Sequence, residues 1–235
     1  MLLRVILVVV VLGAVLAAGA WWLSAPRPLA AADLPDHAGD PAAGERIFHA
    51  GGCAACHVAE DDDGDGPPRL AGGHVLETPV GGIVAPNISP DPEHGIGGWT
   101  AADFVNAMKR GIAPDGSFYY PAFPWTSYRL METTDALDLF AYLKTLPAVS
   151  GRPEAETAVA FPFSVRRGIG LWKRFAMAGD PPPPAETNET IARGAYLSNA
   201  LGHCGQCHTP RTALYALDTD RWMAGAPSLG GRGFV

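Results

Sequence analysis

All four cysteines of this 235-residue chain lie in two short segments that share the pattern Cys-x-x-Cys-His. The residues of the two segments are Cys53, Cys56 and His57, followed by Cys204, Cys207 and His208. This spacing lets two thiols form thioether bonds with the vinyl groups on one edge of a porphyrin, and the adjacent imidazole can then ligate the iron on the proximal side. We therefore expect two covalently attached haem c groups, with the cysteines as attachment residues and the histidines as proximal iron ligands.

Three other uses of close cysteine pairs explain the pattern less well. A zinc site built from all four thiols would leave the two following histidines without a role. A redox dithiol of the thioredoxin kind needs a βαβ context, which the sequence lacks. A disulfide framework would usually spread its cysteines along the chain so that the bridges close longer loops.

The second axial ligand decides what each haem iron does, and methionine gives a six-coordinate electron carrier with a raised potential. Short cytochromes usually supply this methionine from the loop between the second and last helices, which here spans residues 111–133. Met131 is the only methionine in that window. We expect Met131 on the distal side of the first haem, with Met108 as the alternative, although a methionine inside a helix is ordinarily packing material. Met223 lies too early in the second segment to be a ligand, so the distal ligand of the second haem is expected outside this chain.

Short helices joined by long loops are expected to position these residues, because the chain contains 28 glycines and 22 prolines. The predicted helices cover residues 41–50, 101–110, 135–146 and 189–199. Thr100 and Asp103 have the spacing of a capping box, Gly111 is placed to end that helix, and Thr133 or Thr134 is expected to cap the next one. Residues 60–100 are predicted to be rich in loops.

The two Cys-x-x-Cys-His segments belong to an internal repeat of about 150 residues. A helical pattern precedes each segment, and Leu70-Ala-Gly-Gly and Met223-Ala-Gly-Ala come after the two histidines at similar distances. The second unit reaches Val235 before any counterpart of the later helices of the first unit, so we expect it to be incomplete. The predicted boundaries are a membrane anchor at 1–23, a linker at 24–40, a first domain at 41–149, a second linker at 150–187 and a second, truncated domain at 188–235.

Residues 1–23 carry a single charge, Arg4, and are otherwise apolar or small. At about 1.5 Å of helix rise per residue, they are long enough to cross a hydrocarbon core. Trp21 and Trp22 stand where an interfacial aromatic belt would lie. We expect an uncleaved anchor in a bacterial inner membrane, with its N-terminus in the cytoplasm and the remaining chain in the periplasm. A signal peptide with small residues at its cleavage site, 18–20, is the alternative.

Three segments carry a family resemblance. They are residues 76–100, which include Ala85-Pro-Asn-Ile-Ser-Pro-Asp, then Tyr120-Pro-Ala-Phe-Pro-Trp-Thr-Ser-Tyr, and Gly202-His-Cys-Gly-Gln-Cys-His-Thr-Pro-Arg. They closely resemble the cytochrome c subunits of membrane-bound quinoprotein alcohol dehydrogenases and the related subunits of gluconate, aldehyde and molybdenum hydroxylase-type dehydrogenases. The resemblance implies an all-α protein with tandem class I cytochrome c domains, the second incomplete, behind an N-terminal transmembrane helix. It also implies electron transfer from a periplasmic dehydrogenase to quinone, a terminal oxidase or a soluble cytochrome.

The chain departs from that family in two respects. The alcohol dehydrogenase subunits carry three haem domains, whereas this chain has one and a partial second and is similar to a shorter dihaem branch. Those subunits also place a methionine, their iron ligand, where this chain has Phe123. Either Met131 or Met108 then replaces it, or the first haem is open on one side.

The sequence favours an electron-transfer protein over an enzyme, because it shows no convincing catalytic acid, base or substrate pocket. A dihaem peroxidase or a haem-based gas or redox sensor is the alternative, and either would need an open iron. The formal net charge is −7, and no basic stripe is present, so nucleic acid is not an expected partner.

Overall fold

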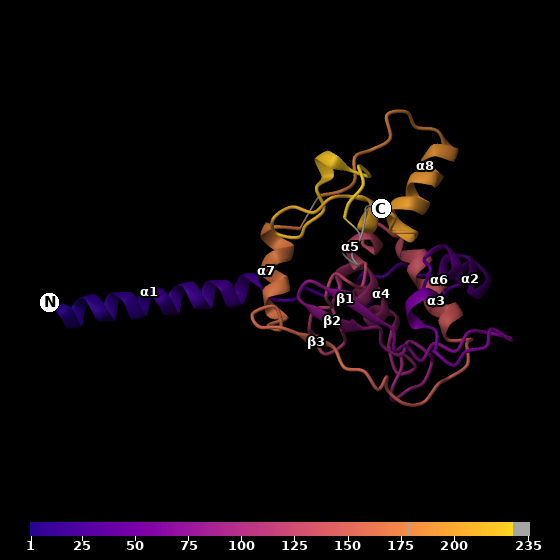
Figure 1. Cartoon of the computed structure of the whole chain (residues 1–235), viewed down its shortest axis with the longest axis horizontal. Coiled ribbons are helices and arrows are strands. Elements are labelled where there is room, and N and C mark those ends of the chain that lie inside the picture. Colours follow the sequence, from indigo (N-terminus) through magenta and orange to yellow (C-terminus); the bar gives the residue numbers. More distant parts are fainter. Residues whose placement is uncertain (178, 228–235) are drawn as a thin grey trace.

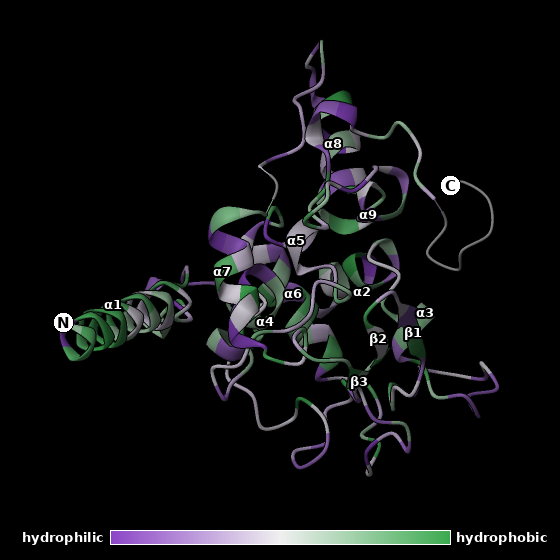
Figure 2. Ribbon diagram, turned by 60° about the vertical axis from the view of Figure 1, so that its left-hand side comes forward, coloured by the Kyte–Doolittle hydropathy of each residue, from purple (hydrophilic) through white to green (hydrophobic). Residues whose placement is uncertain are grey.

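A long apolar helix, α1 (Leu2–Leu23), projects from the body of the protein in the computed structural model, as Figure 1 shows. The structure describes residues 1–177 and 179–227. None of the residues of α1 is buried, and its length and hydropathy suffice to cross a membrane, a test that a signal sequence also passes. In Figure 2, α1 is coloured mostly as hydrophobic, which is typical of a helix surrounded by lipid or buried in a core.

The first unit is built from three main helices, α2 (Pro41–Ala50), α4 (Ala101–Arg110) and α6 (Thr133–Leu143). Helices α2 and α6 lie in close contact. A Cβ atom placed on Gly44 would lie only 2.0 Å from the carbonyl oxygen of Asp138. Only glycine allows two helix backbones to approach so closely at this point. Apolar side chains from all three helices form one core, which includes Phe48, Val105 and Leu139.

Local signals predicted two of these helices correctly. Helix α2 has the expected bounds, and α4 begins after Thr100, whose Oγ1 accepts a hydrogen bond from the Asp103 amide at 3.2 Å. Gly111 ends α4 with a φ of +59°, which glycine adopts without strain. Helix α6 differs from the prediction: its N-cap residue is Glu132, which makes no capping side-chain bond, and the helix ends at Leu143.

A small antiparallel sheet corrects the expectation of an all-α protein. Strands β1 (Val75–Thr78), β2 (Gly81–Val84) and β3 (Ala158–Val159) lie in that order, with Val75 opposite Val84 and Gly81 opposite Val159. Strands β1 and β2 each have only four residues. An alternation of side chains over so short a length does not identify a strand from the sequence alone. A Cβ atom on Gly81 would lie 2.0 Å from the Ala158 oxygen, so β3 can pair here because residue 81 is glycine.

The segment expected as a second linker, 150–187, is more ordered than predicted. Besides β3 it contains α7 (Arg167–Phe175), and its residue 178 lies outside the described residues.

Two one-turn helices complete the first unit, namely α3 (Ala54–His57) and α5 (Trp125–Tyr128). A 3₁₀ turn at Ala31–Asp33 precedes them in the chain.

The second unit begins with α8 (Glu189–Tyr196), which is shorter than the predicted helix. A π-helical turn, Leu197–Leu201, continues it, and α9 (Gly205–His208) and a 3₁₀ turn at Thr219–Arg221 come next. Residues 228–235 of the predicted second domain lie outside the described residues. Asn188 caps α8 by accepting a hydrogen bond from the Ile191 amide at 2.9 Å.

Candidate functional site

The first Cys-x-x-Cys-His segment forms a single helical turn directly after α2. The chain leaves α2 through Gly51 and Gly52, and Gly52 has a φ of +62°. Cys53 is then the N-cap of α3, and its carbonyl accepts a hydrogen bond from the His57 amide at 3.1 Å. Both thiols of this segment are free rather than joined in a disulfide. One turn therefore brings two free thiols and an imidazole together.

The imidazole of His57 is held by a residue from a distant part of the chain. Its Nδ1 lies 2.8 Å from the carbonyl oxygen of Pro86. A carbonyl can only accept, so Nδ1 carries the proton and Nε2 has a free lone pair. Burial also lowers the pKa of His57 below its ordinary value, which favours the neutral ring that ligates a metal.

The side chains of this segment fit a covalently attached haem. Two unpaired thiols are available for thioether bonds, and a neutral, oriented imidazole is available for the iron. Burial raises the pKa of the Cys53 thiol to about 12, so this cysteine is mainly a neutral thiol near neutral pH. The role of Pro86 was not identified from the sequence. This residue lies in a segment that carries the family resemblance, but no sequence pattern indicates that its carbonyl binds His57.

The second segment repeats the backbone geometry of the first. Cys204 precedes α9, and its carbonyl accepts a hydrogen bond from the His208 amide at 3.0 Å. In both units a glycine amide binds the carbonyl of the motif histidine at 2.8 Å: Gly72 binds His57, and Gly225 binds His208. These glycines have φ values of +74° and +84°. The internal repeat predicted from the sequence is thus visible in the backbone around both sites.

The two segments lie against each other. A Cβ atom placed on Gly51 would lie 3.8 Å from the carbonyl oxygen of Leu201, and one placed on Gly202 would lie 3.8 Å from that of Ala50. Each of these Cβ atoms would also lie 3.5 Å from the sulfur of the first cysteine in its own segment. The two candidate attachment sites therefore meet at the backbone that precedes their first cysteines.

Two aromatic rings close the contact between the segments. Tyr128 donates a hydrogen bond from its hydroxyl to the Gly51 oxygen at 3.3 Å, and its ring packs edge-on against that of His203, with centroids 5.7 Å apart. Burial raises the pKa of Tyr128 well above its ordinary value, and burial lowers that of His203. Both side chains are thus held neutral between the two segments.

Gln206, one of the variable residues inside the second motif, attaches α9 to the first unit. Its Nε2 donates hydrogen bonds to Thr126 Oγ1 at 2.8 Å and to Ser127 Oγ at 2.9 Å, both on α5. Its backbone carbonyl accepts a hydrogen bond from Arg211 at 2.8 Å. A buried amide with all of these hydrogen-bond partners stabilises the folded state, whereas a buried amide without partners would lower the free energy of unfolding. Sequence reasoning missed this role, because a variable motif position carries no local signal.

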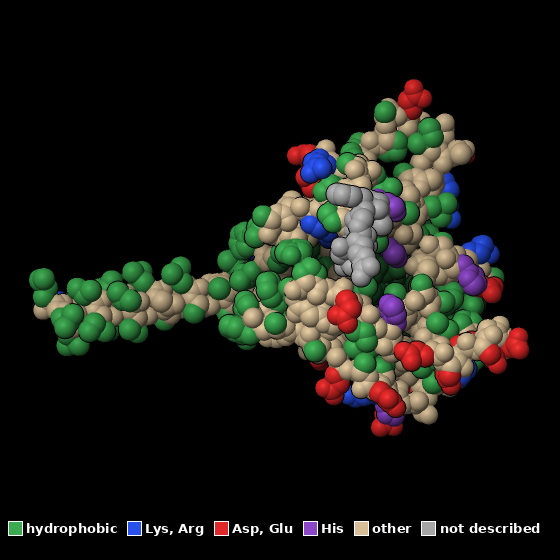
Figure 3. Space-filling view, in the orientation of Figure 1, with side chains coloured by type: hydrophobic (Ala, Val, Ile, Leu, Met, Phe, Trp, Pro, Cys, Tyr) green, Lys and Arg blue, Asp and Glu red, His purple; other side chains and the backbone are tan. Residues whose placement is uncertain are grey.

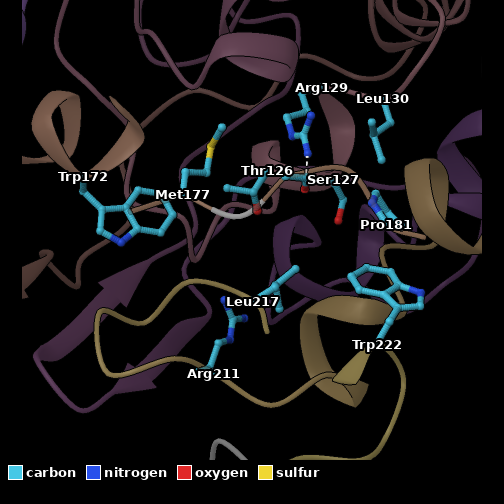
Figure 4. A pocket seen from close by; sticks show the side chains of 11 residues that line it. Thr126, Ser127, Arg129, Leu130, Trp172, Met177, Pro181, Arg211, Leu217 and Trp222 are labelled. Carbon is cyan, nitrogen blue, oxygen red and sulfur yellow. Dashed lines mark hydrogen bonds between the residues drawn. The ribbon is translucent and has the colours of Figure 1, made fainter. Parts of the chain in front are cut away.

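A small pocket lies beside this contact, between α5, α7 and the second unit (Figure 4). The side chains of Trp172 and Trp222 lie on opposite sides of it in that view, and Arg129 stands between them. Arg129 forms an ion pair with Asp180 and donates a hydrogen bond to the Gly179 carbonyl at 2.7 Å. These contacts fasten the chain leading into the second unit to the first unit.

Both candidate distal methionines are buried in the core of the first unit. The exposed fraction is 1% for Met131 and 5% for Met108. Phe123 and Cys53 pack against this same core from its edge. Burial near the first site is compatible with a distal role for either methionine, so the choice of Met131 stays a prediction.

The zinc alternative finds no support in the geometry. Within residues 1–177 and 179–227, no group of three or more His, Cys, Asp or Glu side chains is arranged so as to hold a metal ion. A tetrahedral zinc site would require such a convergence of thiols.

Comparison with known proteins agrees with the geometry. The cytochrome c family model matches residues 41–147, which cover the first site and its helices. A diheme cytochrome c-type protein of Cereibacter sphaeroides is 47% identical over an alignment of 232 residues, which covers 95% of this chain and 76% of that protein. The predicted resemblance to cytochrome c proteins is thereby confirmed.

Two further relatives are dehydrogenase subunits. The fructose dehydrogenase cytochrome subunit of Gluconobacter japonicus is 39% identical over 185 residues, which are 78% of this chain and 37% of that subunit. The gluconate 2-dehydrogenase cytochrome c subunit of Pantoea cypripedii is 37% identical over 172 residues, 72% of this chain and 38% of that subunit. This chain thus spans less than two fifths of either subunit. The match along most of the Cereibacter protein shows that the chain belongs to the family of diheme c-type cytochromes.

Proposed function

We propose that this protein carries two covalently attached haem c groups and passes single electrons from a dehydrogenase towards the respiratory chain. The proposed attachment residues are Cys53, Cys56, Cys204 and Cys207, and the proposed proximal ligands are His57 and His208. Haem iron, when bound, supplies the one-electron couple. The reciprocal contact of Gly51 and Gly202 carries the proposal, because it brings two alike Cys-x-x-Cys-His turns together inside one molecule.

The residues of the chain would supply attachment and orientation. The thiols would hold the porphyrin edge, and the Pro86 carbonyl keeps the His57 imidazole in one orientation and one tautomer. A Cβ atom on Gly51 or Gly202 would lie 3.8 Å from the backbone of the other segment, which is ordinary van der Waals contact, so the two attachment segments lie close together. Their proximity favours electron exchange between the two proposed haems.

We propose Met131 as the distal ligand of the first haem, with Met108 as the alternative. The side chain of Met131 is fully buried, so water has little access to it. Its backbone carbonyl accepts a hydrogen bond from Lys109, which holds the loop that carries it. A methionine ligand in a dry core is the arrangement that raises a haem potential.

The wider setting is proposed from α1 and from the relatives. Helix α1 would anchor the protein in the inner membrane, with haem domains at 41–149 and 188–235 in the periplasm. Residues 24–40 and 150–187 would connect these parts. The cytochrome subunits of fructose and gluconate dehydrogenases are relatives, which supports a dehydrogenase as electron donor. Quinone, a terminal oxidase or a soluble cytochrome would accept the electrons.

Intact mass and visible absorption of the exported full-length protein test the proposal. We expect two haem masses added to the polypeptide, and one after Cys53 and Cys56, or Cys204 and Cys207, are both replaced by alanine. Carbon monoxide should leave the reduced spectrum of the first haem unchanged if a methionine ligates it. A colourless protein with the mass of the bare polypeptide would disprove the proposal.

A further inference from the structure

The segment that precedes and forms α7 presents an unusual surface beside the end of α1. We call residues 161–175 the rim segment. Its exposed apolar side chains are Phe161, Phe163, Val165 and Phe175, and the exposed fractions of Phe161 and Phe175 are 82% and 69%. Figure 3 shows that apolar side chains continue from α1 onto the neighbouring part of the body. Three phenylalanines exposed within fifteen residues indicate a surface that meets something apolar.

The rim segment is fixed to the end of α1 by Arg167. Its Nε donates a hydrogen bond to Ser24 Oγ at 2.9 Å, and its Nη2 donates one to the Trp21 carbonyl at 2.9 Å. The guanidinium also lies over the Trp21 ring, 4.2 Å from the centroid. Its positive charge thus stands at the negative end of the α1 dipole and occupies a carbonyl that the helix leaves unpaired.

Backbone packing fixes the same junction. A Cβ atom placed on Gly170 would lie 2.3 Å from the Ser24 oxygen, so α7 passes directly over the end of α1. In Figures 1 and 2, α7 crosses the end of α1 rather than continuing its direction. A helix that crosses the end of a transmembrane helix lies along the surface of the membrane rather than through it.

The charge of the rim segment differs from that of the whole chain. It contains Arg166, Arg167, Lys173 and Arg174 and no acidic residue, although the chain has a net charge of −7. On the face drawn in Figure 3, acidic side chains lie mostly over parts of the body away from α1. Exposed phenylalanines together with arginine and lysine are the composition of segments that lie in the lipid headgroup region.

We propose that the rim segment lies in the outer headgroup region of the bilayer that α1 crosses, with its phenylalanines inserted among the lipids. This inference rests on the proposed membrane anchor. The occupant of the apolar surface is the bilayer, because the surface continues from the end of α1 and carries the exposed cation Arg174, which complements lipid phosphates. Insertion of both α1 and the rim segment into the bilayer would fix the orientation of the rest of the protein relative to the membrane. In Figures 1 and 2 the first site, at α3, lies on the side of the body away from α1, so it would face the aqueous phase.

Photolabelling of the full-length holoprotein tests this placement. The probe is a vesicle of phosphatidylcholine and phosphatidylglycerol that contains a lipid with a diazirine close to its headgroup. After illumination and digestion, mass spectrometry should find labelled α1 and labelled residues 161–165 and 175. Ile191 on α8 is also an exposed apolar residue, and its peptide serves as the internal control that should remain near background.

Two variants sharpen the test. Replacing both Phe161 and Phe163 by serine should lower labelling of the rim segment several-fold while leaving α1 labelled, and Ile191→Ser should change neither. If α1 is labelled but the rim segment is no more labelled than α8, the inference is wrong and the anchor stands. If α1 itself is unlabelled, both the anchor and the inference fail.

Discussion

Gly51 and Gly202 are in reciprocal contact across the two candidate haem sites. Each stands two residues before the first cysteine of its motif, and a Cβ atom on either would lie 3.8 Å from the carbonyl oxygen of the residue preceding the other. The contact has the symmetry of the internal repeat. Because it precedes both first cysteines, its geometry decides how near the two proposed attachment edges lie.

A bulky side chain at this contact should separate the two sites. Gly202 has a φ of −75°, so Gly202→Leu costs no unusual backbone strain, but the new side chain must displace Ala50 or its neighbours. We expect weaker excitonic coupling between the haems in the Soret circular dichroism spectrum and slower electron exchange between them. Gly194→Leu on α8 is the control, because a Cβ atom there meets nothing within 4 Å. Equal excitonic coupling in the unmodified protein, Gly202→Leu and Gly194→Leu would contradict the proposed proximity of the two haems.

Replacing Gly72 by alanine should destabilise the first site. Its φ is +74°, and a Cβ atom would lie 2.4 Å from the Ala85 oxygen, beside the Pro86 carbonyl that holds His57. We expect Gly72→Ala to lower the free energy of unfolding by about 2–4 kcal/mol, from backbone strain and steric overlap together. Thermal or denaturant unfolding followed by circular dichroism measures the change.

Gly116→Ala is the matched control for that variant. Its φ is +80°, but a Cβ atom there meets nothing within 4 Å, so only the backbone strain applies. We expect a loss of about 1 kcal/mol. If the two variants lose the same stability, the close approach of residue 72 to Ala85 contributes nothing.

Removing the Gln206 amide should loosen the second unit from the first. Gln206→Leu leaves the hydroxyls of Thr126 and Ser127 without this partner, at a cost of about 1–3 kcal/mol. Hydrogen exchange should become faster in α9 and α5 while α2 and α6 keep their protection. Adding Ser127→Ala to Gln206→Leu should cost less than the sum of the two single changes. Strict additivity would show that the two side chains do not interact.

The two methionines can be separated spectroscopically. Met131→Leu should remove the near-infrared band of methionine-ligated ferric haem from the first haem and allow carbon monoxide to bind there. Met108→Leu should cost stability, because it changes a buried side chain in α4, but should leave that band in place. The opposite pattern would assign the ligand to Met108. If neither change affected the band, the first haem would lack a methionine ligand.

Stability at alkaline pH should depend on Lys173. Burial lowers its pKa from 10.5 to about 8, and its ammonium lies 4.6 Å from the Trp125 ring centroid. Between about pH 8 and 10.5 the unfolded chain binds more protons at this residue than the folded chain does, so the free energy of unfolding should rise with pH. Lys173→Met should flatten this rise in urea titrations. An unchanged slope would show that Lys173 is not the group responsible.

Features with local signals could be predicted from the order of residues alone. The two Cys-x-x-Cys-His motifs predict haem attachment through spacing within five residues, and each folds as one helical turn. The capping pair Thr100 and Asp103 set the start of α4 because both partners lie within one turn. Helix α1 could be predicted from composition, since a helix satisfies every backbone polar group of so long an apolar run in lipid.

Contacts between distant residues became known only from the folded chain. Pro86 holds His57 across 29 residues, Gln206 reaches Ser127 across 79, and Arg167 reaches Ser24 across 143. Strand β3 forms only because Gly81 leaves room for it. Each of these contacts depends on where the whole chain packs, and no period or motif in the sequence records a pairing over such separations. The spacing of residues along the chain predicted the chemistry proposed for the sites, and long-range packing determined their mutual position.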